Sequence, residues 1–164
     1  MLIGKEGGTA MPQTGKPLTQ RHSPEEILNL LYNTGFRLTG SHRETTDLVL
    51  RAFDALTGCE KVNFSTALKG LCSVYIKTAA ENLGQSLFRN NCSTGKVQEA
   101  LLSLPHKERL VVVLREILGL DYTVIANMTG LRKKDVSELL STGRSYLIKQ
   151  LLPSTEEPKR VLHS

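Results

Sequence analysis

The sequence has no tryptophan, few aromatic side chains and few cysteines. Only 5% of its 164 residues are aromatic, whereas 40% are hydrophobic. A core must therefore be built mainly from aliphatic side chains, which suits packed helices. Cys59, Cys72 and Cys92 are odd in number and form no Cys-x-x-Cys pair. We therefore expect a reducing compartment, with neither a disulfide framework nor a zinc site.

Long hydrophobic runs are also missing. No apolar stretch approaches the roughly 18 residues that a membrane-spanning helix needs. The glycine-rich N-terminus lacks the apolar segment of a signal peptide. We expect a cytoplasmic chain that does not enter a membrane. The four histidines are scattered along the sequence, and no pair of carboxylates suits acid–base chemistry. The sequence therefore predicts no enzymatic activity, no metal and no cofactor.

An excess of positive charge occurs only in part of the chain. The formal net charge is +5 at pH 7. Residues 23–90 contain equal numbers of basic and acidic side chains, whereas residues 96–150 contain nine Lys and Arg against six Asp and Glu. An excess of cations favours an anionic partner such as nucleic acid. From this distribution of charge, we expect the C-terminal half to contact the anionic partner.

Capping signals and apolar spacing predict helices throughout the sequence. Ser23-Pro24-Glu25-Glu26 has the form of a capping box, and Ser41 to Glu44 repeats it. Apolar residues at three- and four-residue steps predict helices within 23–40 and 41–58, and from 64 to 88. Further helices are expected over 97–102 and 105–118. Three consecutive valines at 111–113 look β-like, but helix start and stop signals flank them.

Turn-forming residues divide the chain into two parts, because residues 90–95 consist of Asn, Cys, Ser, Thr and Gly. The prediction is an all-α protein with two small helical domains joined by a short linker. The expected parts are a disordered tail over 1–22, a helical domain over 23–89, a linker over 90–98, a helix-turn-helix domain over 99–152 and a tail over 153–164.

The strongest local pattern lies between residues 122 and 147. A short helix over 122–128, with Asp121 as its expected N-cap, is followed by a turn containing Gly130 and by a longer helix from Arg132. This order is typical of a helix-turn-helix.

Basic residues gather at the start of the second helix of this motif. Arg132, Lys133 and Lys134 lie where base and phosphate contacts are made, and the helix dipole there also attracts phosphate. Arg144 could reach the DNA backbone from farther along the helix. The alternative is an ordinary helical hairpin whose basic side chains are only solvated.

Two parts of the sequence resemble bacterial RNA polymerase sigma factors, most closely the extracytoplasmic-function group. Residues 104–115, 119–126 and 130–131 are similar to region four, with its Leu-Pro start, Leu-Arg, Gly-Leu-x-Tyr, Ile-Ala and Gly-Leu. Residues 37–40 and 47–49 with Phe53 are similar to region two, and residues 64–88 occupy the place of its promoter-melting helix. The two matches occur in the order of the family.

The resemblance implies promoter DNA, core RNA polymerase and an anti-sigma factor as partners. It also implies roles for individual residues. The residues expected to bind polymerase are Asp47, Leu48, Val49 and Arg51. Those expected to bind DNA are Arg132, Lys133, Lys134, Ser137 and Arg144.

Departures from the family pattern leave two other functions open. Leu50-Arg51 stands where the family usually has Gln-Glu, which reverses the charge on the polymerase-facing helix. The helix over 64–88 also lacks the usual tryptophan and basic run. One alternative is a sigma-like helix-turn-helix regulator without initiation activity. The other is a helical module that binds a protein partner and not DNA.

Overall fold

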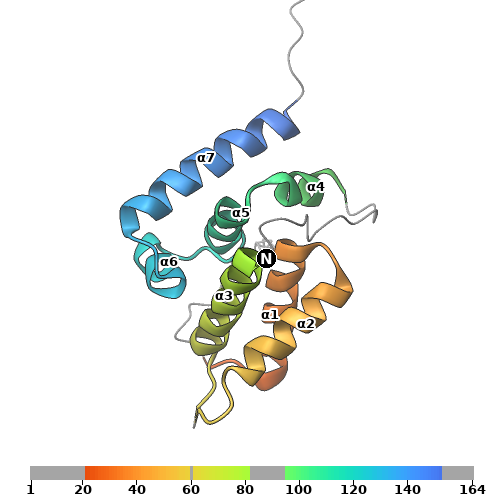
Figure 1. Cartoon of the computed structure of the whole chain (residues 1–164), viewed down its shortest axis with the longest axis vertical. Helices are drawn as coiled ribbons and strands as arrows, with labels where there is room; N and C mark the ends of the chain where they lie inside the picture. The colour runs from red at the N-terminus through yellow and green to blue at the C-terminus, as the bar shows by residue number, and fades with distance from the viewer. Residues whose placement is uncertain (1–20, 60, 82–94, 153–164) are drawn as a thin grey trace, which may run out of the picture.

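The computed structural model of the chain describes residues 21–59, 61–81 and 95–152. Within these residues it contains helices and no strand (Figure 1), so the predicted all-α class is confirmed. The elements are α1 (Pro24–Thr39), α2 (His42–Asp54), α3 (Phe64–Glu81), α4 (Lys96–Ser103), α5 (His106–Val112), the π-helical turn η1 (Val113–Ile117), α6 (Tyr122–Thr129) and α7 (Lys133–Leu151).

Parts of the predicted organisation fall outside the described residues. These are most of the tail over 1–22, the last residues of the helix over 64–88, most of the linker and the tail over 153–164. Residues 96–98, which the sequence assigns to the linker, form the first turn of α4. The division into two domains stays a prediction. Below, the first unit means α1–α3 and the second unit means α4–α7.

The expected helix caps form in part. Ser23 and Glu26 make the complete capping box, because Ser23 Oγ accepts the Glu26 N–H (3.1 Å) and Glu26 Oε2 accepts the Ser23 N–H (2.9 Å). At the second expected box, Ser41 Oγ accepts the Glu44 N–H at 3.5 Å, but the Ser41 N–H donates to Thr39 Oγ1. That box is therefore only half formed.

The first unit is a three-helix cluster around α3. The apolar stripe predicted for α3 faces the core, and its described members are buried: Phe64, Leu68, Leu71, Cys72, Tyr75 and Ala79. Cys72 is a small, fully buried core residue, and this burial raises the pKa of its thiol to about 12. Ile27, Leu31 and Leu38 of α1 and Ala52 of α2 complete the cluster.

The two units pack against each other and share one hydrophobic core. Helix α1 contacts α4, α5 and η1, and α3 contacts α5 and α6. In Figure 1, α4 and α5 lie between α7 and the first unit. A single cluster of buried side chains runs from Ile27 in α1 to Leu140 in α7. The orientation of the helix-turn-helix is therefore fixed by contacts with the first unit as well as by its own core.

The C-terminal end of α1 packs tightly against α4 of the second unit. Gly40 ends this helix with φ 71°, a left-handed conformation that favours glycine. A Cβ atom on Gly40 would lie 2.4 Å from Leu102 Cδ1 of α4. The buried Gln98 side chain of α4 donates from Nε2 to the carbonyls of Phe36 (3.2 Å) and Arg37 (3.1 Å). The Phe36 carbonyl also accepts the Gly40 N–H (2.8 Å), so the second unit gives it a second donor and supplies a donor to the Arg37 carbonyl at the helix end.

Arg109 of α5 makes a second buried polar contact between the units. Its side chain is 5% exposed. Nη1 donates to the carbonyl of Leu38 (2.8 Å) at the end of α1, and Nη2 donates to the carbonyls of Leu102 (2.6 Å) and Leu104 (2.8 Å) at the end of α4. Burial lowers the pKa of Arg109, whereas the adjacent Tyr75 hydroxyl raises it. A cation at two helix C-termini also interacts favourably with both helix dipoles.

A π-helical turn, which the sequence analysis does not foresee, continues α5. The Leu118 N–H bonds to the carbonyl of Val113 (3.3 Å), five residues earlier. The turn places Arg115 beside the start of α6. There Arg115 donates to the carbonyl of Leu120 (2.8 Å) and lies 3.5 Å from the carboxylate of Asp121. Asp121 occupies the N-cap position of α6, as expected, but its side chain makes no capping hydrogen bond.

We expect Gly40→Ala to destabilise the protein more than Gly130→Ala. The two glycines end helices with nearly the same conformation, φ 71° and ψ 5° at Gly40 and φ 72° and ψ 10° at Gly130. A Cβ atom would meet Leu102 at Gly40, but no atom within 4 Å at Gly130. Backbone strain should cost about 1 kcal/mol in both variants, and overpacking about 1–3 kcal/mol more at Gly40. Urea unfolding followed by circular dichroism measures the difference. Equal losses would contradict tight packing between the units.

We expect Arg109→Ala to lower the free energy of unfolding by about 2–4 kcal/mol, because it leaves several buried carbonyl groups without a donor. Lys107→Ala, an exposed lysine in the first turn of the same helix, is the matched control and should change stability by less than about 0.5 kcal/mol. The same urea titrations give both values. A loss from Arg109→Ala that is no larger than the control's would show that Arg109 does not stabilise the packed units.

Candidate nucleic-acid interface

The segment over 122–151 has helix-turn-helix geometry, as the sequence predicts. The short helix α6 ends at Gly130, whose N–H bonds to the carbonyl of Ala126 (2.9 Å). Three residues, 130–132, separate α6 from the longer helix α7. Ile125 of α6 and Val136 and Leu140 of α7 are at most 1% exposed and form the core beneath the motif. This core fixes the angle between the two helices.

The three basic residues at the start of α7 are exposed together. Arg132 occupies the N-cap position, and Lys133 and Lys134 are the first two residues of the helix. Ser137, one turn farther along, is also exposed. The helix N-terminus adds a partial positive charge to this surface. The structure therefore brings four of the five predicted DNA-binding residues to one exposed end of α7.

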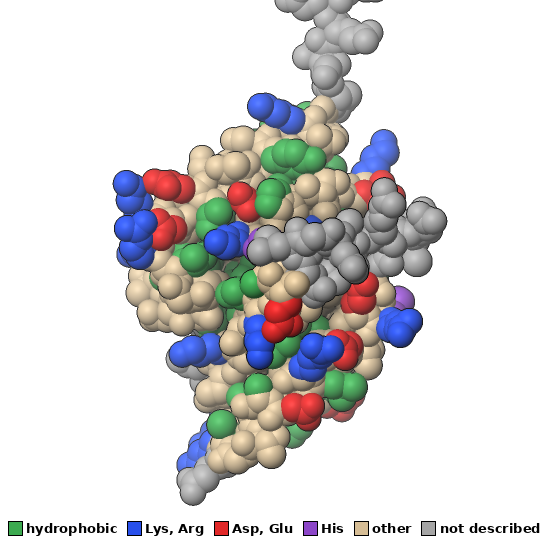
Figure 2. Space-filling view, in the orientation of Figure 1, with side chains coloured by type: hydrophobic (Ala, Val, Ile, Leu, Met, Phe, Trp, Pro, Cys, Tyr) green, Lys and Arg blue, Asp and Glu red, His purple; other side chains and the backbone are tan. Residues whose placement is uncertain are grey.

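Acidic residues of α7 partly neutralise these cations. The Arg132 guanidinium donates to both carboxylate oxygens of Asp135, at 2.8 Å from Nε and 2.7 Å from Nη2. This hydrogen-bonded pair raises the pKa of Arg132 and lowers the pKa of Asp135. Lys134 Nζ lies 3.7 Å from Glu138 Oε1. At the corner between α6 and α7, at the left edge of Figure 2, basic and acidic side chains lie side by side.

Arg144 does not belong to this exposed end. It lies 12 residues beyond Arg132, or about 18 Å at 1.5 Å per residue. Its Nε donates to Glu116 Oε1 of η1 (2.8 Å), and this bond raises the pKa of Arg144. The observed role of Arg144 is to connect α7 to η1.

The residues expected to contact polymerase divide into two kinds. Asp47 and Arg51 are exposed on α2 and form an ion pair, with Arg51 Nε 2.9 Å from Asp47 Oδ2. Leu48 is 6% exposed and Val49 3%, and both pack in the core of the first unit. Their side chains cannot offer the expected apolar surface. Leu50, which the sequence analysis does not select, is 59% exposed between Asp47 and Arg51.

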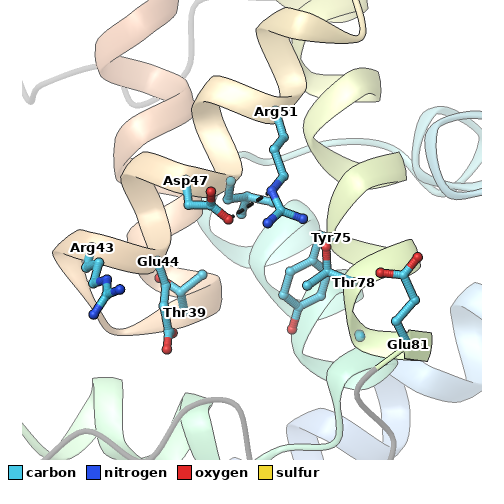
Figure 3. Close-up of a pocket in the computed structure, with 10 residues that line it drawn as sticks. Thr39, Arg43, Glu44, Asp47, Arg51, Tyr75, Thr78 and Glu81 are labelled. Atoms are coloured by element: carbon cyan, nitrogen blue, oxygen red, sulfur yellow. Dashed lines mark ion pairs between the residues drawn. The ribbon is translucent and has the colours of Figure 1, made fainter.

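A pocket of about 530 Å³ opens between α2 and α3 (Figure 3). Arg43, Glu44, Asp47 and Arg51 of α2 line one side, and Tyr75, Thr78 and Glu81 of α3 line the other. Burial raises the pKa of Glu44, whereas the adjacent Arg43 lowers it. The pocket carries charges of both signs and suits polar side chains of a protein partner better than an apolar ligand.

The structure gives no support for metal chemistry or a membrane span within the part of the chain that it describes. No group of three or more His, Cys, Asp and Glu side chains in those residues could hold a metal ion. No helix there is long and apolar enough to cross a bilayer.

Sequence reasoning missed the carboxylates that pair with the basic residues. Asp135 follows Arg132 by three residues, and Glu138 follows Lys134 by four, which are the spacings at which helical side chains meet. The signal for these two pairs is therefore present in the sequence. Glu116 is 28 residues from Arg144, and only the packing of η1 on α7 brings them together.

Comparisons with known proteins place the fold. No protein-family model and no curated protein matches the sequence. Among solved structures, the chain is similar to the sigma factor RpoE from Bartonella quintana in complex with the anti-sigma factor NepR. The TM-score is 0.60 at 15% identity, and the match covers 76% of this chain and 91% of that chain. This share of the chain is larger than either unit alone. The chain therefore has an all-α, sigma-factor-like fold across both units.

Proposed function

We propose that this chain is a sigma-factor-like transcription initiation protein. It binds promoter DNA through the N-terminal end of α7 and core RNA polymerase through the outer face of α2. The observation that carries this proposal is the joint exposure of Arg132, Lys133 and Lys134 at the start of the second helix of the motif, in a sigma-factor-like fold. Such a protein acts in the cytoplasm, has no catalytic activity of its own and can be regulated by an anti-sigma factor.

The DNA contact follows from the form of α7. The helix has 19 residues and extends beyond the eight-residue α6, so it can enter a major groove while α6 remains above the backbone. Lys133 has no ion-pair partner among the described residues. It is the cation best placed to bind a phosphate without first losing another contact.

The polymerase contact rests on the exposed residues of α2. Leu50 presents an apolar side chain flanked by the charges of Asp47 and Arg51. An exposed leucine with a charged rim is a common form of protein-binding surface, because the apolar side chain supplies buried area and the charges select the partner.

A second candidate function is favoured by the packing between the units. Helix α3 contacts α6, and Arg109 and Gln98 bond across the boundary between the units. Initiation in which each unit contacts a separate part of a promoter would require these contacts between the units to break. A chain that stays packed would instead be a sigma-like regulator or a module that binds a protein such as an anti-sigma factor. The solved structure that it resembles contains an anti-sigma factor.

Run-off transcription with core polymerase distinguishes the two candidates. The template should carry promoters selected from genomic DNA by the protein together with core enzyme. Specific transcripts that require the chain would support initiation. Polymerase-independent DNA binding without transcripts would favour the regulator, and binding of a protein partner without DNA binding would favour the partner-binding module.

We expect the full chain to bind duplex DNA with an affinity that falls as salt rises, because cations on α7 displace counterions from the phosphates. Lys133→Ala should weaken binding and reduce the slope of log affinity against log salt by about one. Lys107→Ala, an exposed lysine in the first turn of α5, is the control and should leave the slope unchanged. Fluorescence anisotropy with labelled duplexes gives both quantities. No binding at low salt would refute the DNA contact.

We expect Leu50→Gln to weaken the complex with core polymerase by roughly tenfold, because the substitution removes an apolar side chain from the centre of the contact. Leu28→Gln on α1 is the matched control, since Leu28 is also exposed, at 46%. Biolayer interferometry with immobilised core enzyme measures both affinities. Equal affinities for the wild type and Leu50→Gln would exclude this face of α2 as the polymerase contact.

A further inference from the structure

The predicted DNA-binding cations differ in whether the chain already pairs them. Arg132 is held by Asp135 through two hydrogen bonds, and Lys134 lies near Glu138. Lys133, between them in sequence, has no ion-pair partner among the described residues. In the free protein, the first and third of these cations are therefore paired with carboxylates and the second is not. The proposed function does not require this pattern.

The Arg132–Asp135 pair has the geometry of a strong surface contact. Both carboxylate oxygens are engaged, at 2.8 and 2.7 Å, in the planar arrangement that guanidinium and carboxylate groups favour. The Arg132 side chain is 82% exposed and the Asp135 side chain 28%. The carboxylate thus lies against the helix and neutralises a guanidinium that is otherwise exposed to solvent.

We propose that Asp135 and Glu138 are specificity determinants that compete with DNA phosphates for Arg132 and Lys134. This inference rests on the proposed DNA contact of α7. A phosphate that approaches either cation must displace the carboxylate or be repelled by it. The sequence-independent part of DNA affinity comes from such phosphate contacts, whereas contacts to base edges discriminate between sequences. The carboxylates therefore weaken binding to arbitrary DNA and raise the share of the affinity that comes from contacts to base edges.

The acidic residues also contribute to the helix. Asp135 lies in the first turn of α7, where a carboxylate interacts favourably with the helix dipole. Glu138 lies two residues beyond that turn and contributes less to helix initiation. The variants Asp135→Asn and Glu138→Gln therefore both test the competition with phosphate, but Asp135→Asn should destabilise the helix more. Circular dichroism and thermal unfolding of the full chain check that each variant folds.

Each variant should bind a duplex of scrambled sequence about two- to five-fold more tightly than the wild type, since exposed ion pairs are weak. Its salt slope should steepen by about one, as one more cation becomes available to phosphate. Affinity for a duplex selected for tight binding should rise less, so that the ratio of specific to nonspecific affinity falls. Anisotropy titrations at several salt concentrations measure all three quantities. The control is Asp54→Asn, which makes the same change of charge at an exposed position of α2. It should alter none of these three quantities.

A double-mutant cycle separates competition for Arg132 from a general effect of charge. In the wild type, Arg132→Ala should change nonspecific affinity by less than about twofold, because Asp135 already occupies the guanidinium. In the Asp135→Asn background, Arg132→Ala should remove the gain in nonspecific affinity that Asp135→Asn produced. Equal effects of Arg132→Ala in the two backgrounds would overturn the proposal, as would an equal gain from Asp54→Asn.

The failure of this inference can be told apart from the failure of the proposed function. If the wild type binds DNA through Lys133 but Asp135→Asn and Glu138→Gln bind no more tightly, the carboxylates are not competitors and the DNA contact stands. If neither the wild type nor these variants bind any duplex at low salt, α7 is not a DNA-binding helix and both proposals are refuted.

Discussion

Burial of the Arg109 guanidinium is the constraint on which the rest of the structure depends. A buried cation is tolerated only where hydrogen-bond acceptors replace its water. Here those acceptors are carbonyl groups at the ends of α1 and α4, which need donors of their own. Satisfying both requirements fixes α5 against the first unit. Because η1 and α7 pack on α5, and α6 packs on α7 and η1, the direction of the candidate DNA-binding helix depends on this contact.

Much of the fold could be predicted from the sequence because its signals are local. The Ser23 capping box, the left-handed glycine at position 40 and the apolar stripe of α3 involve residues a few positions apart. The packing of the two units could not be predicted in this way. Arg109 resembles an ordinary surface cation in the sequence, and its acceptor Leu38 is 71 residues away. Only the assembled structure shows that the Arg109 side chain is in the interior.

The candidate site shows the same division between local and distant information. The exposure of Arg132, Lys133 and Lys134 follows from their place at a helix start, and the structure has them there. The burial of Leu48 and Val49 follows from the way α2 packs on α3, which the motif Asp47-Leu48-Val49 does not specify. Arg144 is engaged by Glu116, which follows the helix α5 that packs on α7, and no spacing in the sequence indicates a pair 28 residues apart.

The acceptors at the boundary between the units are largely main-chain atoms. Gln98 Nε2 and Arg109 donate to the carbonyl groups of Phe36, Arg37, Leu38, Leu102 and Leu104, which are present whatever side chains those positions carry. Selection to keep this boundary would therefore act on the donor side chains. The residues that supply the carbonyl groups would be free to change. Among descendants of this chain, Gln98 and Arg109 would persist without covarying with those residues. Methods that detect contacts from covariation would pass over these hydrogen bonds.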